Sequence, residues 1–183
     1  MPKKTIIHQL SFIGIGGVQK SFIPYLDVAL KYSCFKHKVF GMYDLDDYYL
    51  NVEKYYSNIS NSIFNKLKFI YFLSSKNHIV HFYNNLASKK VNKLLSTIPS
   101  SNIIFHERGT VWNAKNKKKN IYQQNASKAK IILANSNASK IMLTQRFGID
   151  ENKIRILYNG FLSKKDNFTP KNNDRYSEKF SIG

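Results

Sequence analysis

The sequence is poor in the residues that mark secreted or metal-binding proteins. Its 183 residues include one cysteine, Cys34, so no disulfide can form within the chain. No group of Cys and His residues has the spacing of a zinc site, and no obvious pair of carboxylates could hold another metal. A reducing cytoplasm is the compartment that this composition favours.

Long apolar runs are also lacking, and none is long enough to span a bilayer. The basic start, "MPKKTIIHQLSFIGIGG", is interrupted by His8, Gln9 and Ser11, so it predicts a first strand and not a signal peptide. Triplets of the glycosylation type, such as the one that begins at Asn58, then carry no meaning, because that chemistry belongs to secreted chains.

Acidic residues are scarce: 11 Asp and Glu stand against 29 Lys and Arg, for a formal net charge of +18. The chain is also rich in Lys, Asn, Ile, Tyr and Phe, a mixture that an AT-rich genome produces without functional selection. The charge still attracts anionic membranes, nucleic acids and phosphorylated ligands. No RNP, zinc-finger or basic-zipper pattern is present, so we expect no specific nucleic-acid partner. A basic α/β module that binds phosphate-rich ligands or nucleic acid non-specifically is an alternative function.

The apolar residues recur in short runs with helix-like segments between most of them. These runs cover residues 5–12, 37–42, 78–83, 102–105, 130–134 and 153–157. Runs that are apolar on both faces are typical of parallel strands. The pattern predicts an α/β fold: a Rossmann-like, open, mostly parallel sheet with right-handed crossovers and helices on both faces. Any ligand is then expected at the carboxyl ends of the strands.

Three helices can be placed from their spacing and their ends. A helix over residues 18–31 contains Pro24, which predicts a kink or a short break there. A second helix covers residues 63–71. A third covers residues 137–147, with Ser136 as its N-cap and Gly148 at its end.

The stretch "FIGIGGVQKS", residues 12–21, is close to two phosphate-binding loops and matches neither. Gln19 stands where the dinucleotide pattern needs its third glycine, and also where a Walker A loop needs its second. What remains is a strand, a glycine turn and a helix start, whose unpaired N–H groups and dipole form a site for an anion. A plain tight turn is the alternative.

Polar residues follow four of the predicted strands and would converge on one rim. They are Gly16 and Gly17, Tyr83 to Asn85, His106 to Asn113, and Asn135 and Ser136. His106, Glu107 and Arg108 would place an acid/base group, a carboxylate and a guanidinium at one strand end, which suits phosphates and sugar hydroxyls. A surface ion pair with a capping histidine is the alternative.

Three stretches of the chain resemble glycosyltransferase family 4, the retaining, sugar-nucleotide-dependent enzymes of GT-B fold. "GIGGVQKSFIPYLDVAL" is similar to the family's glycine loop and first helix, and "HIVHFYNN" to its third-strand segment. "IILANSNASKIMLTQRFGIDENKIRILYNGF" is the most specific match, because it follows the family pattern in order over about thirty residues. The resemblance runs from about Ile6 to Phe161 and implies the N-terminal half of a GT-B fold.

The resemblance implies a role for each rim residue. Gly16 and Gly17 would face the donor diphosphate, and His106 would contact the transferred sugar or its acceptor as the catalytic residue. The residues implied to face the acceptor are Gln19, Asn84, Glu107, Arg108 and Ser136. The partners implied are a nucleotide-sugar donor and a glycan or lipid-linked acceptor, in the synthesis of surface polysaccharide or lipopolysaccharide. No metal and no cofactor are implied.

The resemblance also predicts how the chain is divided. Residues 1–160 would form the acceptor-side domain, residues 161–178 a polar linker, and residues 179–183 the start of a second domain. In the family that second domain supplies the E-x7-E carboxylates and most nucleotide contacts. We therefore expect the chain to be an N-terminal part that is inactive alone.

An aromatic and basic cluster, defined by Trp112, Lys117, Lys118 and Lys119, follows the His106 segment. An indole beside lysines suits the boundary between anionic headgroups and apolar chains. The cluster predicts peripheral docking on the inner face of the cell membrane, with a solvated loop as the alternative.

Overall fold

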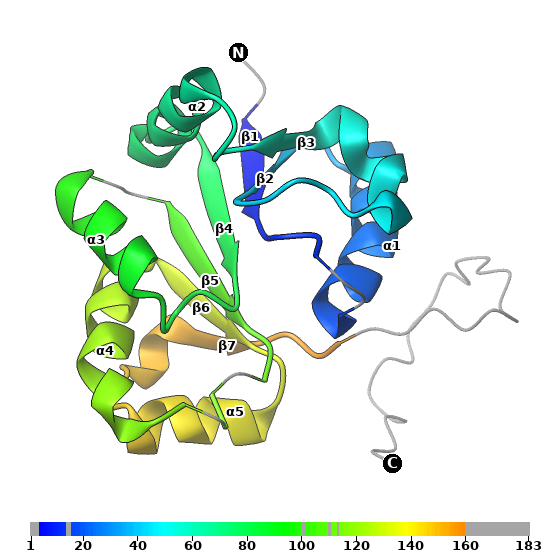
Figure 1. The fold of residues 1–183 in the computed structure, drawn as a ribbon. Helices are drawn as coiled ribbons and strands as arrows, with labels where there is room; N and C mark the ends of the chain where they lie inside the picture. Colours follow the sequence, from blue (N-terminus) through cyan, green and yellow to red (C-terminus); the bar gives the residue numbers. More distant parts are fainter. Residues whose placement is uncertain (1–3, 14–15, 100–101, 110, 113, 160–183) are drawn as a thin grey trace, which may run out of the picture.

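The computed structural model describes residues 4–13, 16–99, 102–109, 111–112 and 114–159, and these residues form one parallel sheet flanked by helices (Figure 1). The sheet has seven strands in the order β3-β2-β1-β4-β5-β6-β7, and every neighbouring pair is parallel. The predicted Rossmann-like α/β fold is confirmed. The expected linker, residues 161–178, and the expected start of a second domain, residues 179–183, lie outside the described residues.

Six of the seven strands coincide with the predicted apolar runs. The strands are β1 Thr5–Gln9, β2 Lys36–Gly41, β3 Tyr56–Asn58, β4 Ile79–Tyr83, β5 Ile103–Glu107, β6 Ile131–Ala134 and β7 Ile154–Ile156. The strand that the sequence did not predict, β3, has three half-buried residues at the edge of the sheet, and its sequence, YSN, has no apolar run.

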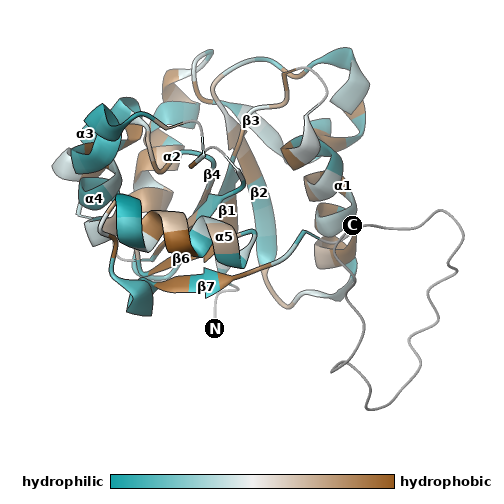
Figure 2. Cartoon of the chain, turned by 90° about the horizontal axis from the view of Figure 1, so that it is seen from below, coloured by the Kyte–Doolittle hydropathy of each residue, from teal (hydrophilic) through white to brown (hydrophobic). Residues whose placement is uncertain are grey.

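The helical segments lie on both faces of the sheet. They are α1 Gly17–Tyr32, η1 Asp47–Tyr55, α2 Ile63–Ser74, α3 Lys89–Thr97, η2 Asn116–Lys118, α4 Lys119–Lys128, α5 Asn137–Ile141, η3 Met142–Arg146 and η4 Glu151–Lys153. In Figure 1, α1 lies to the right of the sheet, and α2, α3 and α4 lie to its left. The same division appears from below in Figure 2, with α1 on one side and α3 and α4 on the other.

Two helix predictions need correction. α1 runs without a break through Pro24, although a kink or short break was expected there. The continuous helix expected over residues 137–147 is instead a short α-helix, α5, followed by a π-helical turn, η3. Its ends were predicted correctly: Ser136 accepts a hydrogen bond from the Ser139 amide, and Gly148 has a φ of 65°.

The core is divided by the sheet into a large and a small part. Phe69, Phe82, Phe105 and Phe147 belong to the large cluster, which packs α2, α3, α4 and η3 on one face. The small cluster packs Phe22 of α1, together with η1, on the other face. Beyond α1, the described residues leave β4, β5 and β6 without a covering helix on that second face (Figure 1). No helix in the described ranges is both long and apolar enough to cross a bilayer.

Candidate functional site

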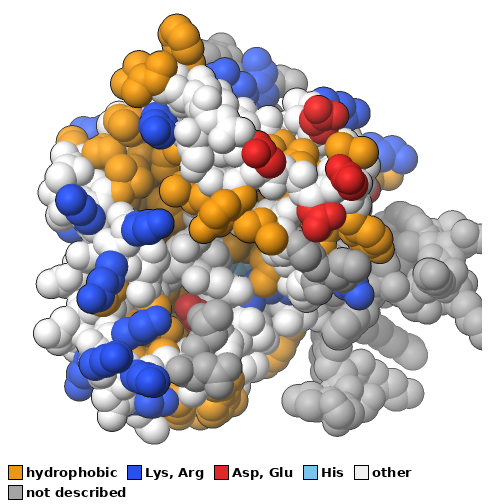
Figure 3. Space-filling model, viewed as in Figure 1, with side chains coloured by type: hydrophobic (Ala, Val, Ile, Leu, Met, Phe, Trp, Pro, Cys, Tyr) orange, Lys and Arg blue, Asp and Glu red, His pale blue; other side chains and the backbone are white. Residues whose placement is uncertain are grey.

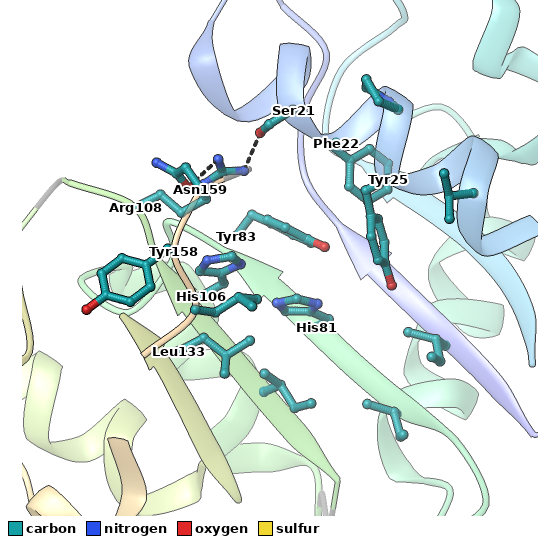
Figure 4. Close-up of a pocket in the computed structure, with 16 residues that line it drawn as sticks. Ser21, Phe22, Tyr25, His81, Tyr83, His106, Arg108, Leu133, Tyr158 and Asn159 are labelled. Atoms are coloured by element: carbon teal, nitrogen blue, oxygen red, sulfur yellow. Dashed lines mark hydrogen bonds between the residues drawn. The ribbon is translucent and has the colours of Figure 1, made fainter. Parts of the chain in front are cut away.

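An open groove of about 550 Å³ lies between α1 and the uncovered part of the sheet. Its floor and walls are apolar, with Tyr25 and Val28 contributed by α1, and Ile79, Ile104 and Leu133 by β4, β5 and β6. Polar side chains gather at one end of this groove, where α1 begins and where the strands end (Figure 4). The groove is therefore an apolar trough with a polar mouth.

Arg108 is the centre of that polar mouth. Its guanidinium donates one hydrogen bond of 2.5 Å to Ser21 Oγ on α1 and another of 2.6 Å to Asn159 Oδ1, just beyond β7 (Figure 4). No carboxylate within salt-bridge distance of Arg108 is found among the described residues. Partial burial lowers the pKa of Arg108, but a guanidinium remains protonated at neutral pH. The mouth thus holds a fixed positive charge without an acidic partner.

Asn84, at the end of β4, holds this segment in place. Its backbone is left-handed, with a φ of 53°, a conformation that asparagine tolerates better than most residues. Asn84 Oδ1 accepts a 2.8 Å hydrogen bond from the Arg108 amide, and the Asn84 amide donates to the His106 carbonyl at 2.9 Å. The side chain of Asn84 therefore positions Arg108.

His106 occupies the groove beside Arg108. Its side chain is 6% exposed, and its ring stacks on that of His81 at 5.5 Å between centroids. Neither ring nitrogen of His106 has a hydrogen-bond partner among the described residues. Burial, with a smaller effect of the Arg108 charge, lowers the pKa of His106 to about 4. At neutral pH the ring is an uncharged hydrogen-bonding group, so positive charge at this site comes from Arg108.

Behind His106, three polar rings form a buried chain that the sequence reading missed. Tyr83 Oη lies 3.3 Å from His8 Nδ1, and His8 Nε2 lies 3.0 Å from His37 Nδ1. Tyr83 Oη can donate to His8 Nδ1, and His8 Nε2 can donate to His37 Nδ1. Both hydrogen bonds then form while the two imidazole rings are neutral. Burial, and the nearby His37, lower the pKa of His8 to about 3. The signal that could have found the chain is the presence of His37, His8 and Tyr83 on three apolar runs that form neighbouring strands, β2, β1 and β4.

Glu107 is not where the sequence placed it. The strand expected to end at residue 105 continues to Glu107, so His106 and Glu107 are strand neighbours whose side chains point to opposite faces. His106 lines the groove, whereas Glu107 is fully buried and does not line it. Of the three residues expected together at this strand end, His106 and Arg108 therefore line the groove and Glu107 does not.

The glycine turn begins α1 close to the mouth of the groove. Gly16 is the N-cap of the helix and makes no side-chain cap, and the first turn contains no acidic residue. Gln19 Nε2 donates to the Ser11 carbonyl at 2.8 Å, and a Cβ on Gly16 would come within 2.4 Å of Gln19 Oε1. Gln19 therefore closes over Gly16, whereas Gly17 is open to solvent. Gly14 lies outside the described residues.

The remaining predicted residues lie apart from the groove lining. Ser136 is occupied as the cap of α5. Lys117, Lys118 and Lys119 are exposed at the start of α4, and Trp112 is 50% exposed. The structure thus brings together Tyr83, His106 and Arg108, and it adds Ser21 and Asn159, which were not predicted from the sequence. No group of three or more His, Cys, Asp or Glu that could hold a metal occurs in the described ranges.

Solved structures of glycosyltransferases share this fold. HepE (Alr3699) of Anabaena, in complex with UDP-glucose, matches with a TM-score of 0.64 at 17% identity, over 86% of this chain and 44% of that chain. The same protein with UDP and glucose gives 0.63 at 16% identity, over 86% and 45%. A glycosyltransferase from Rickettsia africae ESF-5 gives 0.57 at 20% identity, over 86% and 43%.

At these identities the likeness is one of fold. The chain spans less than half the length of each of these structures. No protein-family model matches the sequence, and no curated protein does.

Proposed function

We propose that this chain is the N-terminal, acceptor-side part of a retaining glycosyltransferase of the family 4 type, which moves a sugar from a nucleotide-sugar donor. The observation that carries the proposal is Arg108 at the carboxyl edge of the sheet, a fixed cation with no salt-bridge partner in the described part of the chain. Ligands of open α/β sheets bind at this edge. The likeness to HepE, a protein solved with UDP-glucose, supports the same assignment.

The positive groups and the neutral groups of the mouth would bind different parts of the substrates. The uncapped N–H groups at the start of α1, next to Gly16 and Gly17, and the Arg108 guanidinium would stabilise the diphosphate as it leaves. His106, neutral at pH 7, would hydrogen-bond the transferred sugar or the acceptor hydroxyl. Asn84 positions Arg108, and Gln19 holds the glycine turn. No step requires a metal or a cofactor.

The acceptor is a glycan or a lipid-linked sugar, and the pathway is the assembly of surface polysaccharide or lipopolysaccharide. Most donor contacts would come from a second domain, so the chain alone would lack turnover. Accordingly, incubation of the chain with UDP-glucose should release no UDP. Release of UDP at a rate above that of the buffer would contradict the assignment of the chain as one part of the enzyme.

Trp112, the only tryptophan, follows Arg108 closely in the sequence and provides a direct test of binding. We expect its fluorescence to change in a saturable way as UDP-glucose is added. Arg108→Gln should weaken this response at least about tenfold, because it removes a charge-assisted contact to phosphate. Arg155→Gln, at an exposed position on β7, is the matched control and should bind like the parent chain. Equal binding by the two variants would overturn the proposed site.

A further inference from the structure

α2 carries two apolar faces, one packed against the sheet and the other exposed to solvent. Phe69, Phe72 and Leu73 are buried against the sheet. On the outside, five more apolar side chains are exposed to solvent, and we call them the α2 stripe. They are Ile63, Phe64, Leu67, Ile70 and Tyr71, with exposed fractions from 38% to 78%. In Figure 3, hydrophobic side chains gather over the upper left of the molecule, where Figure 1 places α2.

The stripe is continuous along the helix and bordered by lysine. At about 100° per residue, its five positions fall within a sector of about 120°. On the same helical wheel, Lys66 falls just beyond one edge of this sector and Lys68 just beyond the other. Lysine side chains at such borders can lay their methylenes along an apolar surface and extend their ammonium groups to anionic headgroups.

The segment of the sequence that contains α2 carries charge of one sign. Between Glu53 and Glu107 the sequence has seven lysines and no Asp or Glu. Lys38 of β2 lies beside Lys68, and the charge of Lys68 adds to burial in lowering the pKa of Lys38. Neither lysine has a salt-bridge partner among the described residues. Two adjacent ammonium groups without a carboxylate form a place where an anionic group would be stabilised.

We propose that the α2 stripe is a membrane-docking surface that inserts its apolar side chains into the interface of an anionic bilayer. A solvent-facing stripe of large apolar residues with a lysine at each border is typical of helices that lie in the plane of a membrane surface. A second copy of this chain fits less well, because two molecules of charge +18 would bring their lysines together. Charge complementarity instead favours an anionic lipid bilayer as the partner of the α2 stripe.

This surface differs from the cluster of Trp112 and Lys117 to Lys119. That cluster lies at the start of α4, at the bottom of Figure 1, whereas α2 lies at the top. The α2 proposal does not rest on the proposed transferase function, because binding to vesicles requires no catalytic activity. The failure of one proposal therefore leaves the other standing.

The test is flotation of the full chain with phosphatidylcholine vesicles, prepared with and without phosphatidylglycerol. Phe64→Gln with Leu67→Gln should lower the partition coefficient on anionic vesicles at least about tenfold, because it removes the inserting side chains and keeps residues that favour a helix. Tyr32→Gln with Leu50→Gln is the matched control, since these side chains are 73% and 56% exposed but lie on α1 and η1. The control should bind like the parent chain.

A second pair of variants separates the two basic surfaces. Lys66→Ser with Lys68→Ser should lower binding to anionic vesicles about tenfold or more. Replacement of Lys117, Lys118 and Lys119 by Ser should change it less than twofold, since that cluster lies away from α2. Loss of binding in the second variant, with the Phe64 and Leu67 variant unaffected, would overturn the proposal. So would a dimer in vesicle-free buffer that the Phe64 and Leu67 substitutions dissociate.

Discussion

Among single residues, the groove combines one charged side chain, Arg108, with rings that stay neutral. Arg108 is held by the hydrogen bonds that it donates to Ser21 of α1 and to Asn159 beyond β7, while His106 is buried deeply enough to stay uncharged. His8 behind it is neutral for the same reason. A diphosphate would therefore meet one fixed cation, and sugar hydroxyls would meet an uncharged imidazole.

Burial of His106 makes a prediction about pH. Because its pKa is about 4 in the folded chain and about 6.5 in the unfolded chain, only the unfolded chain takes up this proton between those values. The free energy of unfolding should fall as the pH falls below about 6.5, by about 1.4 kcal/mol per pH unit for this residue. The His106→Gln variant lacks this titrating group, so its free energy of unfolding should fall less over the same pH range. Urea unfolding at about pH 7.5 and about pH 5.5 measures it, and an unchanged difference between the two pH values in the variant would contradict the burial argument.

The positions of the site residues could be predicted from the sequence only where the end of a strand could be predicted. His106 and Arg108 were found because polar residues after an apolar run mark the edge of a parallel sheet. Glu107 was misplaced, because the apolar run ends at Phe105 while the hydrogen-bonded ladder continues for two more residues. Ser21 and Asn159 were missed because they reach Arg108 from 87 and 51 residues away along the chain, contacts that no local pattern encodes.

At the scale of elements, α4 is tied to the start of α3 by a buried amide. Asn125 is fully buried, and its Nδ2 donates to the Leu86 carbonyl at 2.9 Å and to the Ser88 carbonyl at 3.3 Å. Its Oδ1 accepts from Asn92 Nδ2 at 3.2 Å. One side chain therefore joins two helices that follow different strands.

Asn125→Asp tests this link with almost no change of volume. The carboxylate cannot donate to the two carbonyls and would be charged in a buried site, so we expect a loss of about 2 to 4 kcal/mol in the free energy of unfolding. Asn120→Asp, at an exposed position of the same helix, is the control and should change it by less than about 0.5 kcal/mol. Chemical denaturation of the two variants gives the comparison, and equal stabilities would refute the role of Asn125.

Elements were predictable where an apolar period was strong. Apolar patterns predicted six strands and the start of α2. Capping residues predicted the helix ends at Ser136 and Gly148. The edge strand β3 has no apolar run, and its pairing with β2 depends on tertiary contact. The change from α5 to a π-turn at Met142 also has no local signal, because apolar spacing alone does not distinguish one helical hydrogen-bond pattern from the other.

At the scale of the whole molecule, the net charge of +18 dominates long-range behaviour. If the chain serves as part of a glycosyltransferase, its binding to duplex DNA should arise from lysine contacts with phosphates alone. The affinity should then be indifferent to sequence and fall steeply with added salt. Fluorescence anisotropy with labelled duplexes of different sequence, at low and at physiological salt, measures this. Tight and sequence-selective binding at physiological salt would favour a nucleic-acid module instead.

The central claim is that a sugar nucleotide binds at the carboxyl edge of the sheet, between the start of α1 and Arg108. Amide chemical-shift mapping of the full chain during titration with UDP-glucose tests it most directly. We expect the largest shifts on the amides of Gly16, Gly17 and Arg108, and we expect that glucose alone does not reproduce them. Shifts spread over exposed lysines elsewhere, such as Lys89, Lys90 and Lys93 on α3, with the strand edge unchanged, would show that charge alone attracts the ligand and would contradict the claim.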